Sequence, residues 1–181
     1  GTMVWRTEAP MSWDEVILQG PHFTVATPMA KQPNENCRHR QDYSEWDLES
    51  LPSSMVPRTN YQRSCDRETY ESRIDQWWGR SSTAYWRVVW RNMTHPSLVR
   101  SLHTALMPPG PQHVHTVHTV ALSAPIATVE LAGLTATLAF DGLIKIAGAG
   151  HVHMEQLARF PFPLDHPLQP ELLLRTLRLN C

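Results

Sequence analysis

Cysteine is scarce in this chain of 181 residues, which contains only Cys37, Cys65 and Cys181. An odd number of cysteines at such wide spacing indicates neither a disulfide framework nor a zinc site of the Cys-x-x-Cys type. Long apolar runs are also missing. The longest uncharged stretch of the most apolar region is 131–140, whereas a membrane-spanning helix needs about 20 residues. We therefore expect a reduced, cytoplasmic protein without a membrane partner.

Acidic residues are absent between Asp75 and Glu130. The formal net charge of the whole chain is −1, which argues against a general binder of polyanions, but this interval is locally basic. Besides histidines it contains four arginines: Arg80, Arg87, Arg91 and Arg100. Arginine suits bidentate contacts to phosphate and guanine, so the interval is a candidate for binding nucleic acid. A bias from genome composition is the alternative.

Catalytic signatures are absent as well. The sequence contains no GxSxG, GxxxxGKS, HExxH or GxGxxG motif. No pair of carboxylates suggests acid–base catalysis, because the acids cluster in loops and in the segment 66–75. These absences favour a protein that binds over one that catalyses, and we expect no catalytic residue in this chain.

The hydrophobic pattern predicts an α+β fold. Apolar alternation and short apolar runs predict two strands within 12–28, split at Gly20-Pro21, and further strands at 84–92 and 112–122. Helical spacing of apolar residues predicts helices at 66–78, 97–107, 125–147, 154–159 and from Pro170 onward. The segment 125–147 is rich in alanine and glycine, so we expect one long apolar helix packed against a small mixed sheet.

The strand at 84–92 has two distinct faces. Alternation places Trp86, Val88 and Trp90 on a face typical of a core. The opposite face carries Tyr85, Arg87, Val89 and Arg91. An exposed surface of arginine and tyrosine suits a nucleic-acid backbone, and an ordinary solvated strand face is the alternative.

Histidines are concentrated in two short stretches, QHVHTVH at 112–118 and HVH at 151–153. In a strand, His113 and His115 lie on one face and His118 on the other, so the first stretch cannot supply three ligands to one ion. An alternative interpretation is a metalloprotein whose site consists of four imidazoles: His113, His115, His151 and His153. Otherwise these histidines are core or surface residues, or they form hydrogen bonds to bases or phosphates.

Four segments follow one another in a recognisable order: VILQGPHFTVATP (16–28), LPSSMVPRTNYQR (51–63), YWRVVWRNM to LMPPG (85–110) and LAGLTATLAFDGLIKIAGAGHVHMEQLARFPFPL (131–164). Together they resemble the C-terminal target-recognition region of large adenine-N6 DNA methyltransferases. That family occurs in type II restriction–modification systems and in phage-defence systems such as DISARM and BREX. In it, an apolar helix of the pattern LL-S--FD leads through a Gly-His turn into a short helix and LP-P. The chain departs from the family's pattern at His95-Pro96-Ser97-Leu98, where the family usually begins a helix with Asn-Glu-Arg-Thr.

The resemblance implies a DNA-reading fragment of a longer protein. The family's catalytic machinery, an NPPY-type motif and a glycine-rich S-adenosylmethionine loop, does not occur in this sequence. By resemblance, the cofactor and the methyltransferase domain belong to an upstream part of the parent protein. We expect 1–181 to form a single target-recognition-like domain that binds double-stranded DNA, with 1–11 as a tag or linker.

On this interpretation the DNA face combines the strand at 84–92 with a loop at 58–63. Asn60 and Gln62 have the amide geometry that reads adenine, and the arginines would contact phosphate or guanine. The full set of expected DNA contacts is Arg58, Asn60, Tyr61, Gln62, Arg63, Tyr85, Arg87, Arg91 and Arg100. A third interpretation is a protein-interaction module of a defence complex, with the tryptophan-rich stretch 77–90 as its contact surface.

Overall fold

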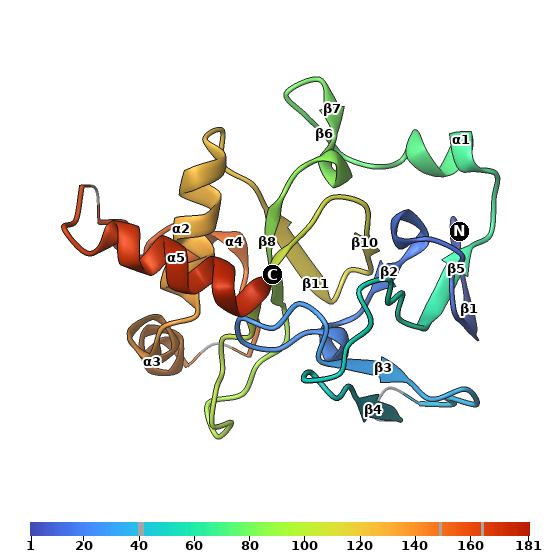
Figure 1. Cartoon of the computed structure of the whole chain (residues 1–181), viewed down its shortest axis with the longest axis horizontal. Coiled ribbons are helices and arrows are strands. Elements are labelled where there is room, and N and C mark those ends of the chain that lie inside the picture. Colours follow the sequence, from blue (N-terminus) through green and yellow to red (C-terminus); the bar gives the residue numbers. More distant parts are fainter. Residues whose placement is uncertain (40–41, 149, 164) are drawn as a thin grey trace.

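The computed structural model describes residues 1–39, 42–148, 150–163 and 165–181. Within these residues the α-helices are α1 (Arg67–Glu71), α2 (Pro125–Thr135), α3 (Leu138–Ala147), α4 (Met154–Leu157) and α5 (Gln169–Asn180). Short 3-10 helices occur at Trp13–Glu15, Gly20–His22 and Ser82–Ala84. Figure 1 shows α2 to α5 on one side of a central sheet and a group of short strands on the other. This mixture of small sheets and helices confirms the α+β class.

The central sheet has three antiparallel strands in the order β11-β8-β9. They are β8 (Arg87–Arg91), β9 (Thr104–Met107) and β11 (Val117–Val120). The run of valine and tryptophan in β8 suits a strand, because β-branched and aromatic side chains pack well on a pleated surface. Trp90 lies opposite Thr104 on one side and His118 on the other.

Both faces of β8 are covered. On one face, Val88 contacts Ala132 of α2, and Trp90 packs with apolar residues of α3 and α4. On the other face, Val89 packs against Val16 and Phe23 from the N-terminal part of the chain. The strand is therefore central in the protein, and the polar side chain of Arg87 on it is enclosed as well.

The helix expected at 97–107 is wrong. Residues 104–107 form β9, and residues 97–103 are an irregular connection from β8. The leucines that suggested a helix have different surroundings: Leu98 is exposed, Leu102 packs with Trp90, and Leu106 packs with Val88. Their four-residue spacing is coincidental, because pairing with β8 decides the conformation of this segment.

The single long helix expected at 125–147 is also wrong. The segment forms two helices, α2 and α3, whose axes differ by 68°. Ala136 ends α2, and Thr137 caps α3 by accepting a hydrogen bond from the backbone N–H of Phe140 at 3.3 Å. A threonine in an alanine-rich run provides this cap without a glycine or proline to mark it.

The C-terminal helix α5 packs across α2 at Gly133. A Cβ atom at Gly133 would contact Thr176 and would lie 2.9 Å from Cδ1 of Leu172, so a larger residue here would force these side chains to shift. At the end of α5, Oδ1 of Asn180 accepts a hydrogen bond of 2.8 Å from the backbone N–H of Leu106. The side chain thus satisfies a donor of β9 that no neighbouring strand pairs.

Pairs of short strands make up the rest of the described fold. They are β1 (Met3–Glu8) with β5 (Thr59–Arg63), β2 (Ile17–Leu18) with β10 (Gln112–His113), β3 (Lys31–Pro33) with β4 (Tyr43–Glu45), and β6 (Gln76–Trp77) with β7 (Arg80–Ser81). Three expectations change. Residues 3–8 are a paired strand rather than a linker, 59–63 are a strand rather than a loop, and the helix expected at 66–78 ends at Glu71.

Candidate functional site

Arg87 lies inside the protein. Only 1% of the residue is exposed, and its Nη2 donates a hydrogen bond of 2.6 Å to the carbonyl oxygen of Pro111. Burial lowers the pKa of this guanidinium to about 10. The expectation that this strand face is open to solvent is wrong, because the segment around Val16 and Phe23 packs on it.

Arg91 is half-buried on the same face. Its Nη2 donates to the carbonyl oxygen of Phe23, and its guanidinium carbon lies 5.8 Å from the centre of the Phe23 ring. Burial lowers the pKa of Arg91 to about 10 as well. The side chain runs over Gly20, where a Cβ atom would lie 3.3 Å from Cγ of Arg91. Unlike Arg87, Arg91 lines a surface cleft.

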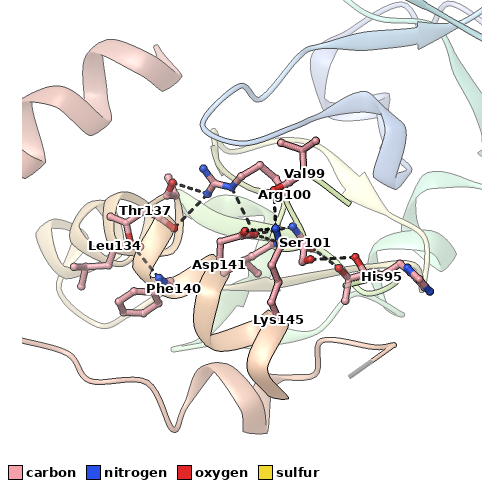
Figure 2. Close-up of polar contacts among 12 residues, drawn as sticks. His95, Val99, Arg100, Ser101, Leu134, Thr137, Phe140, Asp141 and Lys145 are labelled. Carbon is pink, nitrogen blue, oxygen red and sulfur yellow. Dashed lines mark hydrogen bonds and ion pairs between the residues drawn. The ribbon is translucent and has the colours of Figure 1, made fainter. Parts of the chain in front are cut away.

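Arg100 and Tyr85 are engaged in local structure. The Nη2 of Arg100 donates to the carbonyl oxygens of Ala136 and Thr137 at 2.8 and 3.3 Å, and its Nε lies 3.5 Å from Oδ1 of Asp141. Figure 2 shows this guanidinium at the junction of α2 and α3, where it satisfies carbonyl groups at the end of a helix. The hydroxyl of Tyr85 donates to the carbonyl oxygen of Trp77 at 2.9 Å.

Asn60 is completely buried, so the expectation that its amide reads adenine does not fit this conformation. Its Oδ1 accepts from the hydroxyl of Thr7 at 2.7 Å. Its Nδ2 donates to Oε1 of Gln19 at 3.2 Å and to the hydroxyl of Tyr43 at 3.1 Å. These bonds fix β5 to its neighbours, and Asn60 is a structural residue.

Thr59 is buried as well, whereas Arg58, Tyr61, Gln62 and Arg63 lie at the surface, partly exposed. Three have partners of their own: Gln62 with Glu8 at 2.8 Å, Arg63 with Glu15 at 3.1 Å, and Arg58 with the carbonyl oxygen of Pro33 at 3.0 Å. Tyr61 packs edge-on against Trp5, with ring centres 5.2 Å apart. Only Tyr61 among them lines the cleft that contains Arg91.

That cleft, here the Tyr61 cleft, lies between the Gly20–His22 turn, β5 and the end of β8. Its volume is about 200 Å³. The lining includes Gln19, Pro21, Tyr61, Arg91, Met93 and His115. The structure therefore brings together two of the predicted DNA contacts from separate segments, with His115 beside them.

The four histidines of the alternative metal site do not line one pocket. His113 lines a separate pocket of about 300 Å³ with Tyr70 and Asp75, and burial lowers the pKa of its imidazole to about 4. His115 is exposed at the Tyr61 cleft. Within the described residues, no three His, Cys, Asp or Glu side chains are placed to hold a metal ion.

His118 joins the second histidine pair instead. Its ring stacks on Trp90 with centres 5.5 Å apart and meets His153 edge-on at 5.7 Å, while His153 stacks with His151 at 6.0 Å. Burial, and then the neighbouring His153, lower the pKa of His118. The pairing of β11 with β8 places His118 beside Trp90, and this long-range pairing is not visible in the spacing of the histidines.

Asn92 connects these histidines with the segment that contains His115. Its backbone N–H donates to the carbonyl oxygen of Thr116 at 2.9 Å, and its carbonyl oxygen accepts from Val152 at 2.7 Å. Its Oδ1 lies 3.2 Å from Nδ1 of His151. We define the histidine surface as five residues: Asn92, His115, His118, His151 and His153. Asn92 and His118 were missed in the sequence, although Asn92 directly follows the arginine strand.

No protein-family model, no curated protein and no solved structure matches this chain. Within the described part of the chain, none of the helices is by itself long and apolar enough to cross a membrane. Helices α2 and α3 have the necessary length and composition only as a pair, which is bent by 68°.

Proposed function

We propose that this chain is a DNA target-recognition module of a site-specific adenine-N6 methyltransferase, from a restriction–modification or phage-defence system. One observation carries the proposal: all four segments that resemble that family contribute to one region. Pro21 and Tyr61 line the Tyr61 cleft with Met93, and Met93 pairs with His151 through a β-bridge. Segments far apart in the sequence thus contribute to a single surface.

The chemistry of this region suits a polyanion with hydrogen-bonding edges. Imidazole nitrogens donate or accept hydrogen bonds, and the amide of Asn92 does both. Arg91 supplies a permanent cation at the cleft. The acidic residue nearest in sequence to the histidine surface is Glu155, which follows His153. The stretch from 76 to 129 contains no acidic residue.

The proposal assigns different tasks to this chain and its partners. The chain contacts double-stranded DNA, while methyl transfer from S-adenosylmethionine takes place in a separate domain of the parent protein. A cytoplasmic location follows from this role. The affinity of the chain alone for DNA is weak. Its formal net charge is −1, so its basic side chains neutralise few phosphates.

Fluorescence anisotropy with a labelled DNA duplex at low ionic strength tests the proposal. The double variant His115→Gln/His151→Gln should weaken binding about threefold to tenfold, because hydrogen bonds from the imidazoles to the DNA are lost. His39→Gln is the matched control, an exposed histidine outside the histidine surface.

Absence of duplex binding by the wild-type chain at low ionic strength contradicts the proposal. Equal weakening by the control and by the double variant contradicts the assignment to the histidine surface. Zinc or another transition metal bound stoichiometrically, and lost on mutating His151 and His153, would instead favour the metalloprotein.

A further inference from the structure

The hairpin formed by β6 and β7 has an unusual residue at its tip. The two strands are joined by Trp78 and Gly79, whose φ angles are 46° and 76°. Two-residue hairpin turns with positive φ at both positions strongly favour Asn-Gly or Gly-Gly. A bulky aromatic residue is strained in this conformation, and such strain persists only where the surrounding structure imposes it.

An aromatic cluster imposes the conformation. The ring of Trp78 meets that of Tyr85 edge-on at 5.3 Å and that of Trp77 at 6.3 Å between centres. The hydroxyl of Tyr85 donates to the carbonyl oxygen of Trp77 at 2.9 Å, which ties the cluster to the hairpin backbone. The strained turn is therefore in contact with one aromatic side chain that precedes it, Trp77, and one that follows it, Tyr85.

The cluster presents the tip to solvent rather than burying it. Trp78 is 58% exposed. A Cβ atom at Gly79 would contact nothing within 4 Å, so the turn has open space around it. Figure 1 shows the hairpin extending away from the central sheet. Core packing does not explain a strained tryptophan at this position.

A cation accompanies the exposed ring. The guanidinium carbon of Arg80 lies 5.7 Å from the centre of the Tyr85 ring. Within the described residues, Arg80 forms no ion pair with a carboxylate. Asp75 precedes the hairpin, and no acid follows it until Glu130. The tip thus combines one accessible indole with one available positive charge.

We propose that Trp78 stacks on an unpaired nucleobase and that Arg80 contacts the adjoining phosphate. The inference rests on the proposed function and adds to it a site for a base outside the helical stack. Aromatic stacking combined with an arginine is the usual means of binding single-stranded nucleic acid, and it tolerates any base. A protein partner fits less well, because the tip offers a single ring flanked by Gln76, Gly79 and Arg80 rather than a broad apolar patch.

The variant Trp78→Gly tests the inference with little risk to folding. Glycine adopts positive φ without strain, so the thermal midpoint of Trp78→Gly should equal or exceed that of the wild type. Affinity for a short oligothymidylate should fall about fivefold to 100-fold, because one stacked base is lost. Trp86→Leu, which removes an exposed indole outside the hairpin, should leave this affinity within about twofold of the wild type.

Fluorescence identifies the stacked partner. Oligothymidylate should quench the emission of the wild type and of Trp86→Leu but not that of Trp78→Gly, and an abasic strand of equal length should quench none of them. An unchanged oligonucleotide affinity in Trp78→Gly, with duplex binding intact, overturns this inference and leaves the proposed function standing. Absence of binding to any nucleic acid overturns both. A fall in affinity for a protein partner alone would assign the hairpin to protein recognition.

Discussion

Asp141 binds a loop that lies forty residues before it in the chain: its Oδ1 accepts a hydrogen bond of 2.7 Å from the backbone N–H of Ser101. The same oxygen accepts from Leu102 at 2.8 Å. Arg100 and Lys145 approach the carboxylate at 3.5 and 3.4 Å, as Figure 2 shows. Burial opposes ionisation of Asp141, but the two backbone donors and the two cations together lower its pKa below the ordinary value.

The variant Asp141→Asn should lower the free energy of unfolding by about 2–3 kcal/mol. The asparagine keeps an oxygen for the backbone donors, but it loses the charge that balances Arg100 and Lys145. Urea denaturation measures the change, with Glu68→Gln, an exposed acid on α1, as the control. A difference below about 0.5 kcal/mol between the two variants would mean that the charge of Asp141 has no part in stability.

Replacing two glycines in neighbouring helices by alanine should change the stability of the protein in opposite directions. Gly133→Ala is expected to destabilise the protein by about 1–3 kcal/mol, because its Cβ would collide with Thr176 and Leu172 of α5. Gly142→Ala in α3 should stabilise it by up to about 1 kcal/mol, because nothing lies within 4 Å and alanine is the better helix former. Thermal denaturation of both variants checks the packing of α5 on α2. Stabilisation by both substitutions would contradict that packing.

Local patterns in the sequence predicted part of this fold. Alternation identified β8, and Pro170 marked the first turn of α5, because these signals depend on neighbouring residues. The break between α2 and α3 depends on the Thr137 cap and on Arg100 from a distant loop, so composition alone suggested one helix. The failure at 97–107 has the same origin, since strand pairing overrides a helical spacing of leucines.

The sequence predicted individual residues of the candidate site but not how the fold brings them together. The segments with Tyr61, Arg91 and His115 do meet at one cleft. Alternation correctly placed Arg87 and Trp90 on opposite faces of the strand. It could not show that the N-terminal segment covers the face with Arg87, which was expected to be exposed. That covering depends on contacts more than sixty residues apart, which a single sequence does not display.

The free energy of unfolding should decrease as the pH is lowered, because two half-buried histidines take up protons on unfolding. Burial lowers the pKa values of His103 and His113 to about 4. Both are neutral in the folded and unfolded states only well above pH 6.5, the pKa of the unfolded imidazole. Between about pH 6.5 and 4 only the unfolded state binds their protons, so the free energy of unfolding decreases as pH falls, by at most about 3 kcal/mol for each.

Urea denaturation of His113→Gln at pH 7, 6 and 5 measures this contribution. The variant should lose part of the decrease between pH 7 and 5, because its side chain no longer takes up a proton on unfolding. His39→Gln is again the control, because its side chain is exposed. If the pH dependence of His113→Gln is the same as that of the wild type, His113 does not have the depressed pKa assigned to it.

The two arginines of β8 should separate stability from DNA binding. Arg87→Ala should lower the free energy of unfolding by about 2–4 kcal/mol, because it leaves a cavity and an unpaired Pro111 carbonyl oxygen. Arg87→Met fills most of that space without a buried charge, and its free energy of unfolding should lie within about 1 kcal/mol of the wild type.

Because Arg87 does not reach the surface, the methionine variant should bind DNA as the wild type does. Arg91→Met should weaken DNA binding severalfold, because Arg91 lines the Tyr61 cleft. Equal losses of DNA affinity in the two methionine variants, measured by anisotropy, would mean that Arg87 reaches DNA after all and that the covering of this strand face opens on binding.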